Sequence, residues 1–227
     1  MIFLLFACTP SEKDTSNDNE PTITVSGRVV ELFGAVGIAG VEVCVSETSV
    51  CTQTDTEGSY TLEATTESNH ILLLTSPDYV GGTLAFTTQD LDVTLANVSL
   101  LSPTLTEGQF STLDQQWESG TGVLAFSISN GINGDGINVP NIEIQLMPQA
   151  GDGPFYSNAV GIPVDNLSET SENGGGVVVN LPEDTYQVNY NGLPDGCELL
   201  LGWGSVDNHQ VPIVSDRVSF ARISCPE

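Results

Sequence analysis

The sequence predicts an all-β protein made of two tandem β-sandwiches joined by a short linker. Lys and Arg supply only 4 of 227 residues, while Gly supplies 23, and this bias favours strands and turns over long helices. Short segments with alternating apolar and polar residues recur between turn signals along most of the chain. The pattern of the first half also returns in outline in the second half, which indicates duplication.

The chain begins with an apolar segment that ends at Cys8. It is too short to cross a bilayer, which takes about 20 residues, and it is typical of a secretion signal. Leu5-Phe6-Ala7-Cys8 resembles a bacterial lipobox, which implies that residues 1–8 are a signal segment and that Cys8 carries lipid. An ordinary apolar N-terminus with an incidental cysteine is the alternative. Residues 9–21 are polar, which predicts a flexible tether.

Residues 22–104 are expected to form the first sandwich. Val41, Val43 and Val45 alternate with Glu42 and Cys44, the pattern of a strand with one buried face. The segment 55–58 has Asp and Gly where a turn needs them. Further strands are predicted at 23–30, 59–62, 71–75, 83–87 and 92–100.

Residues 105–120 are expected to link the two sandwiches. Phe110, Leu113 and Trp117 lie at helical spacing, which predicts a short helix; a packed loop is the alternative.

Residues 121–227 are expected to form a second, diverged sandwich. The segment 122–128 corresponds to the first strand of the first half, and 140–146 alternates apolar and polar residues as 41–45 does. The segment 170–174 stands where 54–58 stood, after a longer insertion at about 147–169.

Apart from Cys8, the chain has four cysteines. This is an even number, as disulfide pairing requires. Local pairing predicts Cys44–Cys51 and Cys197–Cys225. Cys44 shares the outward face of its strand, so the first bridge would stay out of the core. Free or metal-binding thiols are the alternative, although neither pair has the spacing of a zinc site. Disulfides imply an oxidising compartment.

The chain carries 30 acidic against 4 basic residues, a formal net charge of −26. This balance excludes a nucleic-acid binder, which needs a basic surface, and it excludes attraction of basic residues to anionic lipid heads. The simplest interpretation is a soluble, exposed surface. Binding of divalent cations or of a basic partner is the alternative.

No catalytic residues and no cofactor are predicted, so we expect a protein that is not an enzyme. The nucleophile motif G-x-S-x-G does not occur. His70 and His209, the only histidines, stand at a strand border and in a turn-like segment, where a surface or strand-edge position is expected.

Two binding sites are weaker candidates. Asn130, Asn133 and Asp135 lie in a loop of Asn, Asp and Gly that can turn oxygens inward, as calcium requires; a long hairpin connection is the alternative. An aromatic platform for a sugar is the second candidate, and core packing is its alternative. The platform would be made of Phe155, Tyr156 and Trp203.

The motifs of the first half resemble the carboxypeptidase regulatory-like domain, a family of transthyretin-like, prealbumin-type β-sandwiches. The resemblance rests on Gly27-x-Val29, on Gly40-Val41-x-Val43-x-Val45 and on Thr54-Asp55-x-x-Gly58-x-Tyr60-x-Leu62, and it returns more weakly in residues 121–190. It implies two Greek-key sandwiches. It implies function only by analogy. By that analogy, such modules serve as accessory, adhesive or carbohydrate-associated domains.

The expected function is interaction or structural support at the bacterial cell envelope. The partners would be the membrane, through the lipid on Cys8, and an envelope protein or glycan. Thr9 after Cys8 favours the outer membrane, by analogy with known lipoproteins. A carbohydrate-binding module, with or without calcium, is the alternative, and a hydrolase is a third hypothesis.

Overall fold

The computed structural model describes residues 20–32, 35–130 and 136–226. In these residues the chain forms strands β1 to β18 and one short helix, α1. The all-β fold class with a short helix between two β-rich halves is therefore confirmed. Cys8 and most of the tether lie outside the described residues. No helix of the described part is long and apolar enough to cross a membrane.

The first half consists of two facing layers. In one layer β4 pairs antiparallel with β1, and β7 and β8 pair parallel with β1. Its strands are β1 (Thr22–Glu31), β4 (Ser59–Thr65), β7 (Val93–Thr94) and β8 (Val98–Leu100). The other layer has the order β3-β2-β5-β6. Its strands are β2 (Glu42–Val45), β3 (Cys51–Gln53), β5 (Asn69–Ser76) and β6 (Tyr79–Thr87).

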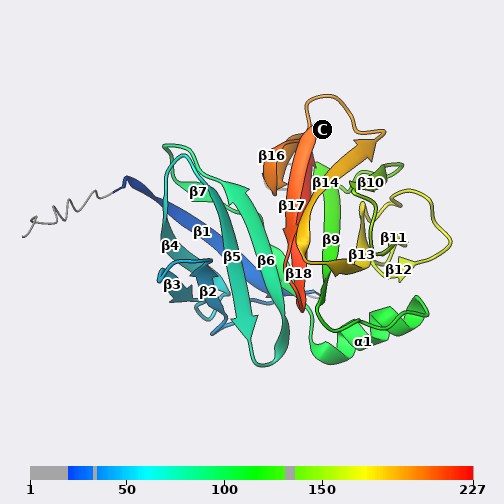
Figure 1. The fold of residues 1–227 in the computed structure, drawn as a ribbon, viewed down its shortest axis with the longest axis horizontal. Coiled ribbons are helices and arrows are strands. Elements are labelled where there is room, and N and C mark those ends of the chain that lie inside the picture. Colours follow the sequence, from blue (N-terminus) through cyan, green and yellow to red (C-terminus); the bar gives the residue numbers. More distant parts are fainter. Residues whose placement is uncertain (1–19, 33–34, 131–135, 227) are drawn as a thin grey trace, which may run out of the picture.

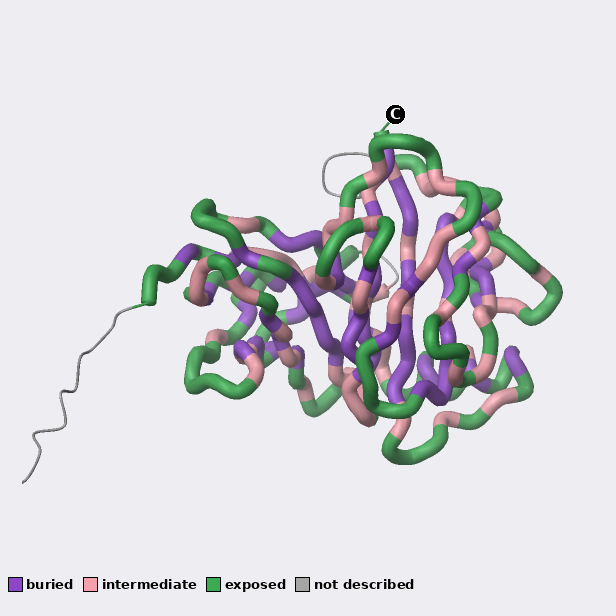
Figure 2. Tube along the Cα trace, turned by 45° about the horizontal axis from the view of Figure 1, so that its top comes forward, coloured by how far each residue is buried: buried purple, intermediate pink, exposed green. Residues whose placement is uncertain are grey.

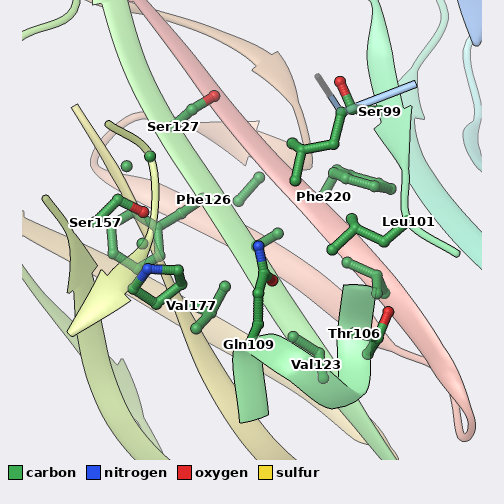
Figure 3. A pocket seen from close by; sticks show the side chains of 18 of the residues that line it. Ser99, Leu101, Thr106, Gln109, Val123, Phe126, Ser127, Ser157, Val177 and Phe220 are labelled. Atoms are coloured by element: carbon green, nitrogen blue, oxygen red, sulfur yellow. The ribbon is translucent and has the colours of Figure 1, made fainter. Parts of the chain in front are cut away.

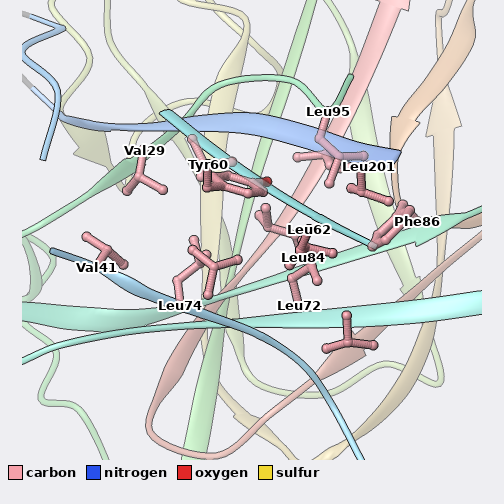
Figure 4. Packing of buried hydrophobic residues seen from close by; sticks show 14 of the residues in the cluster. Val29, Val41, Tyr60, Leu62, Leu72, Leu74, Leu84, Phe86, Leu95 and Leu201 are labelled. Atoms are coloured by element: carbon pink, nitrogen blue, oxygen red, sulfur yellow. The ribbon is translucent and has the colours of Figure 1, made fainter. Parts of the chain in front are cut away.

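The core of the first half lies between these layers (Figure 4). The alternating valines predicted to point inward do so: Val41 and Val43 are fully buried, as is Leu72 on the neighbouring β5. Burial of each such side chain contributes about 1.5–3 kcal/mol. Leu201, from the second half of the chain, packs into this same core. The first half therefore uses an apolar side chain that its own sequence does not supply.

The second half also has two layers. One has the order β10-β14-β17-β16, and the other the order β12-β11-β13-β9-β18, with β15 on β18. The first layer is made of β10 (Glu143–Met147), β14 (Asp184–Asn191), β16 (Trp203–Ser205) and β17 (Asn208–Ile213). The second is made of β9 (Thr121–Asn130), β11 (Asp152–Ser157), β12 (Pro163–Val164), β13 (Gly175–Pro182), β15 (Glu198–Leu201) and β18 (Arg217–Cys225). A second core fills the space between them.

One ten-stranded sheet runs through both halves, because β18 lies between β9 and β6 (Figure 1). It pairs parallel with both: Val218–Cys225 lies beside β9, and Arg217–Phe220 lies beside β6. Buried segments accordingly pass through the middle of the molecule, with exposed turns around them (Figure 2). The sequence predicted two sandwiches in tandem but not this shared sheet. That residues 22–104 and 121–227 are separate domains stays a prediction.

The side chain of Arg217 joins the two halves by hydrogen bonds at the point where β18 pairs with β6. Its guanidinium donates hydrogen bonds to the carbonyl oxygen of Leu74 at 2.9 Å and to the hydroxyl of Thr75 at 3.1 Å, both at the end of β5. Partial burial lowers the pKa of Arg217 below its ordinary value. The side chain thus reaches across β6 and holds three neighbouring strands in register.

Both predicted disulfides are confirmed. Cys44 and Cys51 are directly opposite on β2 and β3, and neither is buried, so the bridge lies on the outward face as expected. Cys197–Cys225 ties the loop before β15 to the end of β18. The chain-entropy estimate gives these bridges about 2.5 and 3.5 kcal/mol of stability.

Helix α1 (Pro103–Thr112) follows β8 and covers part of the outer face of the ten-stranded sheet. Ser102 caps it by accepting a hydrogen bond from the backbone N–H of Leu105 at 3.3 Å. The helix ends earlier than its apolar spacing suggested, because Asp114 adopts a left-handed conformation. The ring of Trp117 nevertheless folds back and stacks on Phe110, with ring centroids 5.5 Å apart.

The repeat seen in the sequence also appears in the hydrogen bonds. The hydroxyl of Thr54 accepts from the backbone N–H of Val41 at 2.9 Å and donates to the carbonyl of Ile38 at 2.6 Å. Thr170 makes the same pair of bonds in the second half, at 3.0 and 2.9 Å. One threonine in each half therefore joins the start of the second strand, β2 or β10, to the turn that precedes β4 or β13.

Candidate functional site

The calcium candidates are only partly within the described residues. Asn130 is the last residue of β9, whereas Asn133 and Asp135 lie outside the described part, so the calcium site stays a prediction. Elsewhere in the described residues, no group of three or more His, Cys, Asp or Glu side chains is placed to hold a metal ion.

The three aromatic residues proposed as a sugar platform do not come together. Phe155 and Tyr156 are neighbours on β11 and so point to opposite faces of the sheet. Tyr156 is buried, and its hydroxyl accepts a hydrogen bond from the backbone N–H of Ile144 at 3.0 Å. Trp203 lies on β16 and donates a hydrogen bond to the carbonyl of His70 at 3.1 Å, in the first half. Tyr156 and Trp203 thus have structural roles.

His70 is buried and structural. Its Nε2 lies 2.8 Å from the carbonyl oxygen of Thr65, and its ring packs against Phe86 with centroids 5.3 Å apart. A carbonyl oxygen only accepts, so Nε2 carries the hydrogen and is the donor.

His209 is fully buried, although its turn-like sequence predicted an exposed position. Nε2 lies 3.0 Å from the carbonyl oxygen of Leu201 and therefore donates to it, while Nδ1 accepts from the hydroxyl of Tyr190 at 2.7 Å. Burial lowers the pKa of His209 to about 4. A neutral ring with both nitrogens engaged is poorly suited to act as a general base.

The buried neutral ring predicts a loss of stability in mild acid. Because the folded-state pKa of His209 lies near 4 and the unfolded value near 6.5, its stabilising contribution is complete above about pH 6.5. It falls as the pH drops toward 4, by about 3 kcal/mol in all. Urea unfolding at several pH values should show this slope. The difference from His209→Gln isolates the histidine, because the carboxylates are common to both proteins; equal slopes would contradict the prediction.

A groove of about 360 Å³ lies on the outer face of the ten-stranded sheet (Figure 3). Its floor consists of outward-facing residues of three neighbouring strands. They are Val123 and Ala125 from β9, Val177 from β13, and Phe220 from β18. Helix α1 forms one wall, and the segment 97–101, which contains β8, forms another. The groove is also lined by Ser157 of β11 and by Val160, Gly161 and Pro163 around β12. We call this space the α1–β8 groove.

The floor is apolar because β9 is a central strand that is covered on both faces. Leu124 and Phe126 point into the second core, while Val123 and Ala125 alternate to the opposite face. Helix α1 covers only part of that face, so Ala125 and Val177 remain partly exposed. The sheet therefore presents an apolar strip that the described residues leave partly uncovered.

The edge of the groove is polar, and among the described residues that line it there is no Asp or Glu. Arg222 is the charged side chain among its lining residues. Its Nε donates to the hydroxyl of Ser127 at 3.0 Å, and its Nη1 donates to the carbonyl oxygen of Asn97 at 2.6 Å. Arg222 thereby joins β18 to the wall that carries β8. In a chain with 30 acidic residues, an acid-free lining sets this surface apart.

The wall formed by β8 is the edge of a sheet. β8 pairs with β1 on one side, and it has no second strand partner in the part of the chain that the structure describes. The carbonyls of Asn97 and Leu101 point away from β1, since they accept from Arg222 and from the backbone N–H of Val80. The backbone N–H and C=O groups of successive residues point to opposite sides of a strand. Ser99 lies two residues from both Asn97 and Leu101, so its N–H and C=O also point away from β1.

Sequence reasoning missed the α1–β8 groove. Its residues come from segments as distant as Asn97 and Arg222, which only the parallel pairing of β18 brings together. One usable signal was present in the run Val218 to Ile223, because apolar residues occur on both of its faces, as expected for a central strand, although Ser219 and Arg222 interrupt the pattern.

No protein-family model matches the chain, and no curated protein matches it. Among solved structures, it is similar to a type II cohesin–X-dockerin complex from Acetivibrio cellulolyticus, with 19% identity, 35% of this chain, 58% of that chain and a TM-score of 0.31. It is also similar to the minor pilin of Streptococcus agalactiae, with 11% identity, 90% of this chain, 97% of that chain and a TM-score of 0.28. The TIE protein of Bacillus anthracis has 13% identity over 89% of this chain and 34% of that chain, with a TM-score of 0.29. At these values we derive neither family nor function from the likeness.

Proposed function

We propose that this protein is a non-enzymatic module of the bacterial cell envelope that is tethered by lipid on Cys8 and binds a partner through the α1–β8 groove. The groove carries the proposal, because it is a partly uncovered apolar surface built from both halves of the chain. The two disulfides support an oxidising location. The lipobox-like segment before Cys8 supports the tether.

A binding role is favoured over catalysis by the positions of the histidines. Both rings are buried, with hydrogen bonds to carbonyl oxygens that hold them in structural roles. The lining of the groove offers neither of them, and it offers no carboxylate. Carbohydrate binding stays a prediction with weaker support, because Phe155, Tyr156 and Trp203 do not meet.

The lipid tether gives a direct prediction. Cys8→Ala should abolish incorporation of labelled palmitate and release the protein from the membrane fraction, because the thiol of Cys8 is the group to which the lipid would be attached. Labelling of cells, followed by fractionation, measures both effects. Ser11→Ala, in the same tether, is the matched control and should label normally. Equal labelling of Cys8→Ala and the parent protein would exclude this anchor.

The binding role can be tested in intact cells by site-specific photo-crosslinking. A photoreactive side chain at Gln109, on the wall of the groove, should form adducts with a partner. The same group at Leu91, which is 73% exposed and lies outside the groove, should form few. Adducts that are absent from both sites, or equal at both, would contradict binding through the groove.

A further inference from the structure

We infer that the occupant of the α1–β8 groove is an extended segment of a partner protein, apolar at alternate positions and flanked by Lys or Arg. This inference rests on the proposed function and specifies the partner's chemistry. Its basis is the combination of a strand edge, an apolar floor and a surrounding acidic surface.

The strand edge provides backbone recognition. The N–H and C=O of Ser99 point away from β1, between the carbonyls that Arg222 and Val80 already occupy. An extended segment in the groove can therefore donate to and accept from Ser99, and so form a short β-bridge on β8. Addition of a strand to a sheet edge gives affinity through the main chain and leaves specificity to the side chains.

The floor favours apolar side chains of modest size. Ala125 and Val177 are partly exposed and lie on neighbouring strands, with Phe220 completing the surface. A strand that lies over this floor directs every second side chain toward it. The other side chains then face solvent and need not be apolar.

The charges favour basic flanks. The lining contains no Asp or Glu, yet Glu107, Glu118 and Glu172 are exposed, and each is the sequence neighbour of a lining residue. The chain as a whole carries a formal charge of −26. An apolar segment between basic residues therefore complements both the neutral floor and its acidic surroundings, and long-range attraction increases the rate of encounter.

The chain's own tether is a poor occupant. Residues 9–19 are polar and mostly acidic where charged, so they would bring carboxylates toward an acidic surface and nothing apolar to the floor. A separate partner with apolar and basic residues therefore complements the groove better than this segment does.

The test uses fluorescently labelled peptides of about nine residues, long enough to cross the groove at roughly 3.3 Å per residue. The first peptide alternates valine and threonine between pairs of lysines. The second replaces the lysines by glutamates, and the third keeps the side chains but has N-methylated amides at alternate positions. We expect saturable binding of the first peptide, measured by anisotropy, and binding about tenfold weaker for each of the others.

Two variants locate the site. Ser99→Pro removes the N–H assigned to the bridge, and proline is tolerated where the N–H of an edge strand does not pair. It should weaken binding about fivefold, while Ser99→Thr, which keeps the N–H, should bind normally. Ala125→Glu places a carboxylate on the floor and should weaken binding by about tenfold or more. Circular dichroism spectra and urea midpoints confirm that each variant is folded.

The outcomes separate the inference from the proposed function. Equal binding of all three peptides, or a first peptide whose affinity is unchanged by both Ser99→Pro and Ala125→Glu, overturns the inference. If none of the three peptides binds, the inference is also overturned. In that case the proposed function still stands if crosslinking at Gln109 yields adducts, and it falls if that crosslinking fails as well.

Discussion

A chain that ends at Ser215, and so lacks β18, should lose cooperative folding in both halves. β18 pairs with β9 over Val218–Cys225 and with β6 over Arg217–Phe220, and its removal exposes core residues such as Ile223, which is fully buried. We expect a loss of about 5 kcal/mol or more, comparable to the whole stability of a small domain. Hydrogen exchange of amides in β1 and β4, far from the cut, measures the effect on the first half.

A chain that ends at Cys225 is the control, because it keeps β18 and the disulfide to Cys197. It should exchange hydrogen as slowly as the full-length protein. A truncated chain whose β1 amides keep their full protection would show that the first half folds alone, and would contradict the role assigned to the shared sheet.

Gly202→Ala should destabilise the protein by about 4 kcal/mol, an exceptional cost for a single methyl group. Gly202 has a φ of +127°, and an added Cβ would lie 2.0 Å from Nε2 of His209. The imidazole cannot move aside easily, because Leu201 and Tyr190 hold its two nitrogens. Urea unfolding measures the change.

Gly196→Ala is the matched control for this substitution. Gly196 also has a positive φ, +82°, but its Cβ would be 3.6 Å from the nearest atom, Cγ of Pro226. It should cost only about 1 kcal/mol of backbone strain. Similar losses from the two substitutions would mean that the contact with His209 is easily relieved.

The features that could be predicted from the sequence are those with local signals. The alternating valines predicted strand β2. The even number and the spacing of the cysteines predicted both disulfides, and the repeated turn motifs indicated the duplication. Thr54 and Thr170 illustrate the duplication, since each begins a recognisable turn motif and makes the same pair of bonds to the start of the second strand of its half.

The features that escaped prediction depend on contacts between distant segments. No local pattern shows that Arg217–Phe220 will lie beside β6, and the α1–β8 groove depends on that pairing. The aromatic platform was grouped by residue type, and strand alternation separated Phe155 from Tyr156. His209 followed turn-forming residues, yet it is buried because its ring fills the space left by Gly202.

The place of β18 in the sheet has a consequence for biogenesis. Among the described strands it is the last to be synthesised, although its partner β6 belongs to the first half. Until it emerges, one side of β6 remains an open edge, and open edges invite pairing with other chains. A nascent molecule must therefore be shielded, or kept unfolded, until β18 has been synthesised.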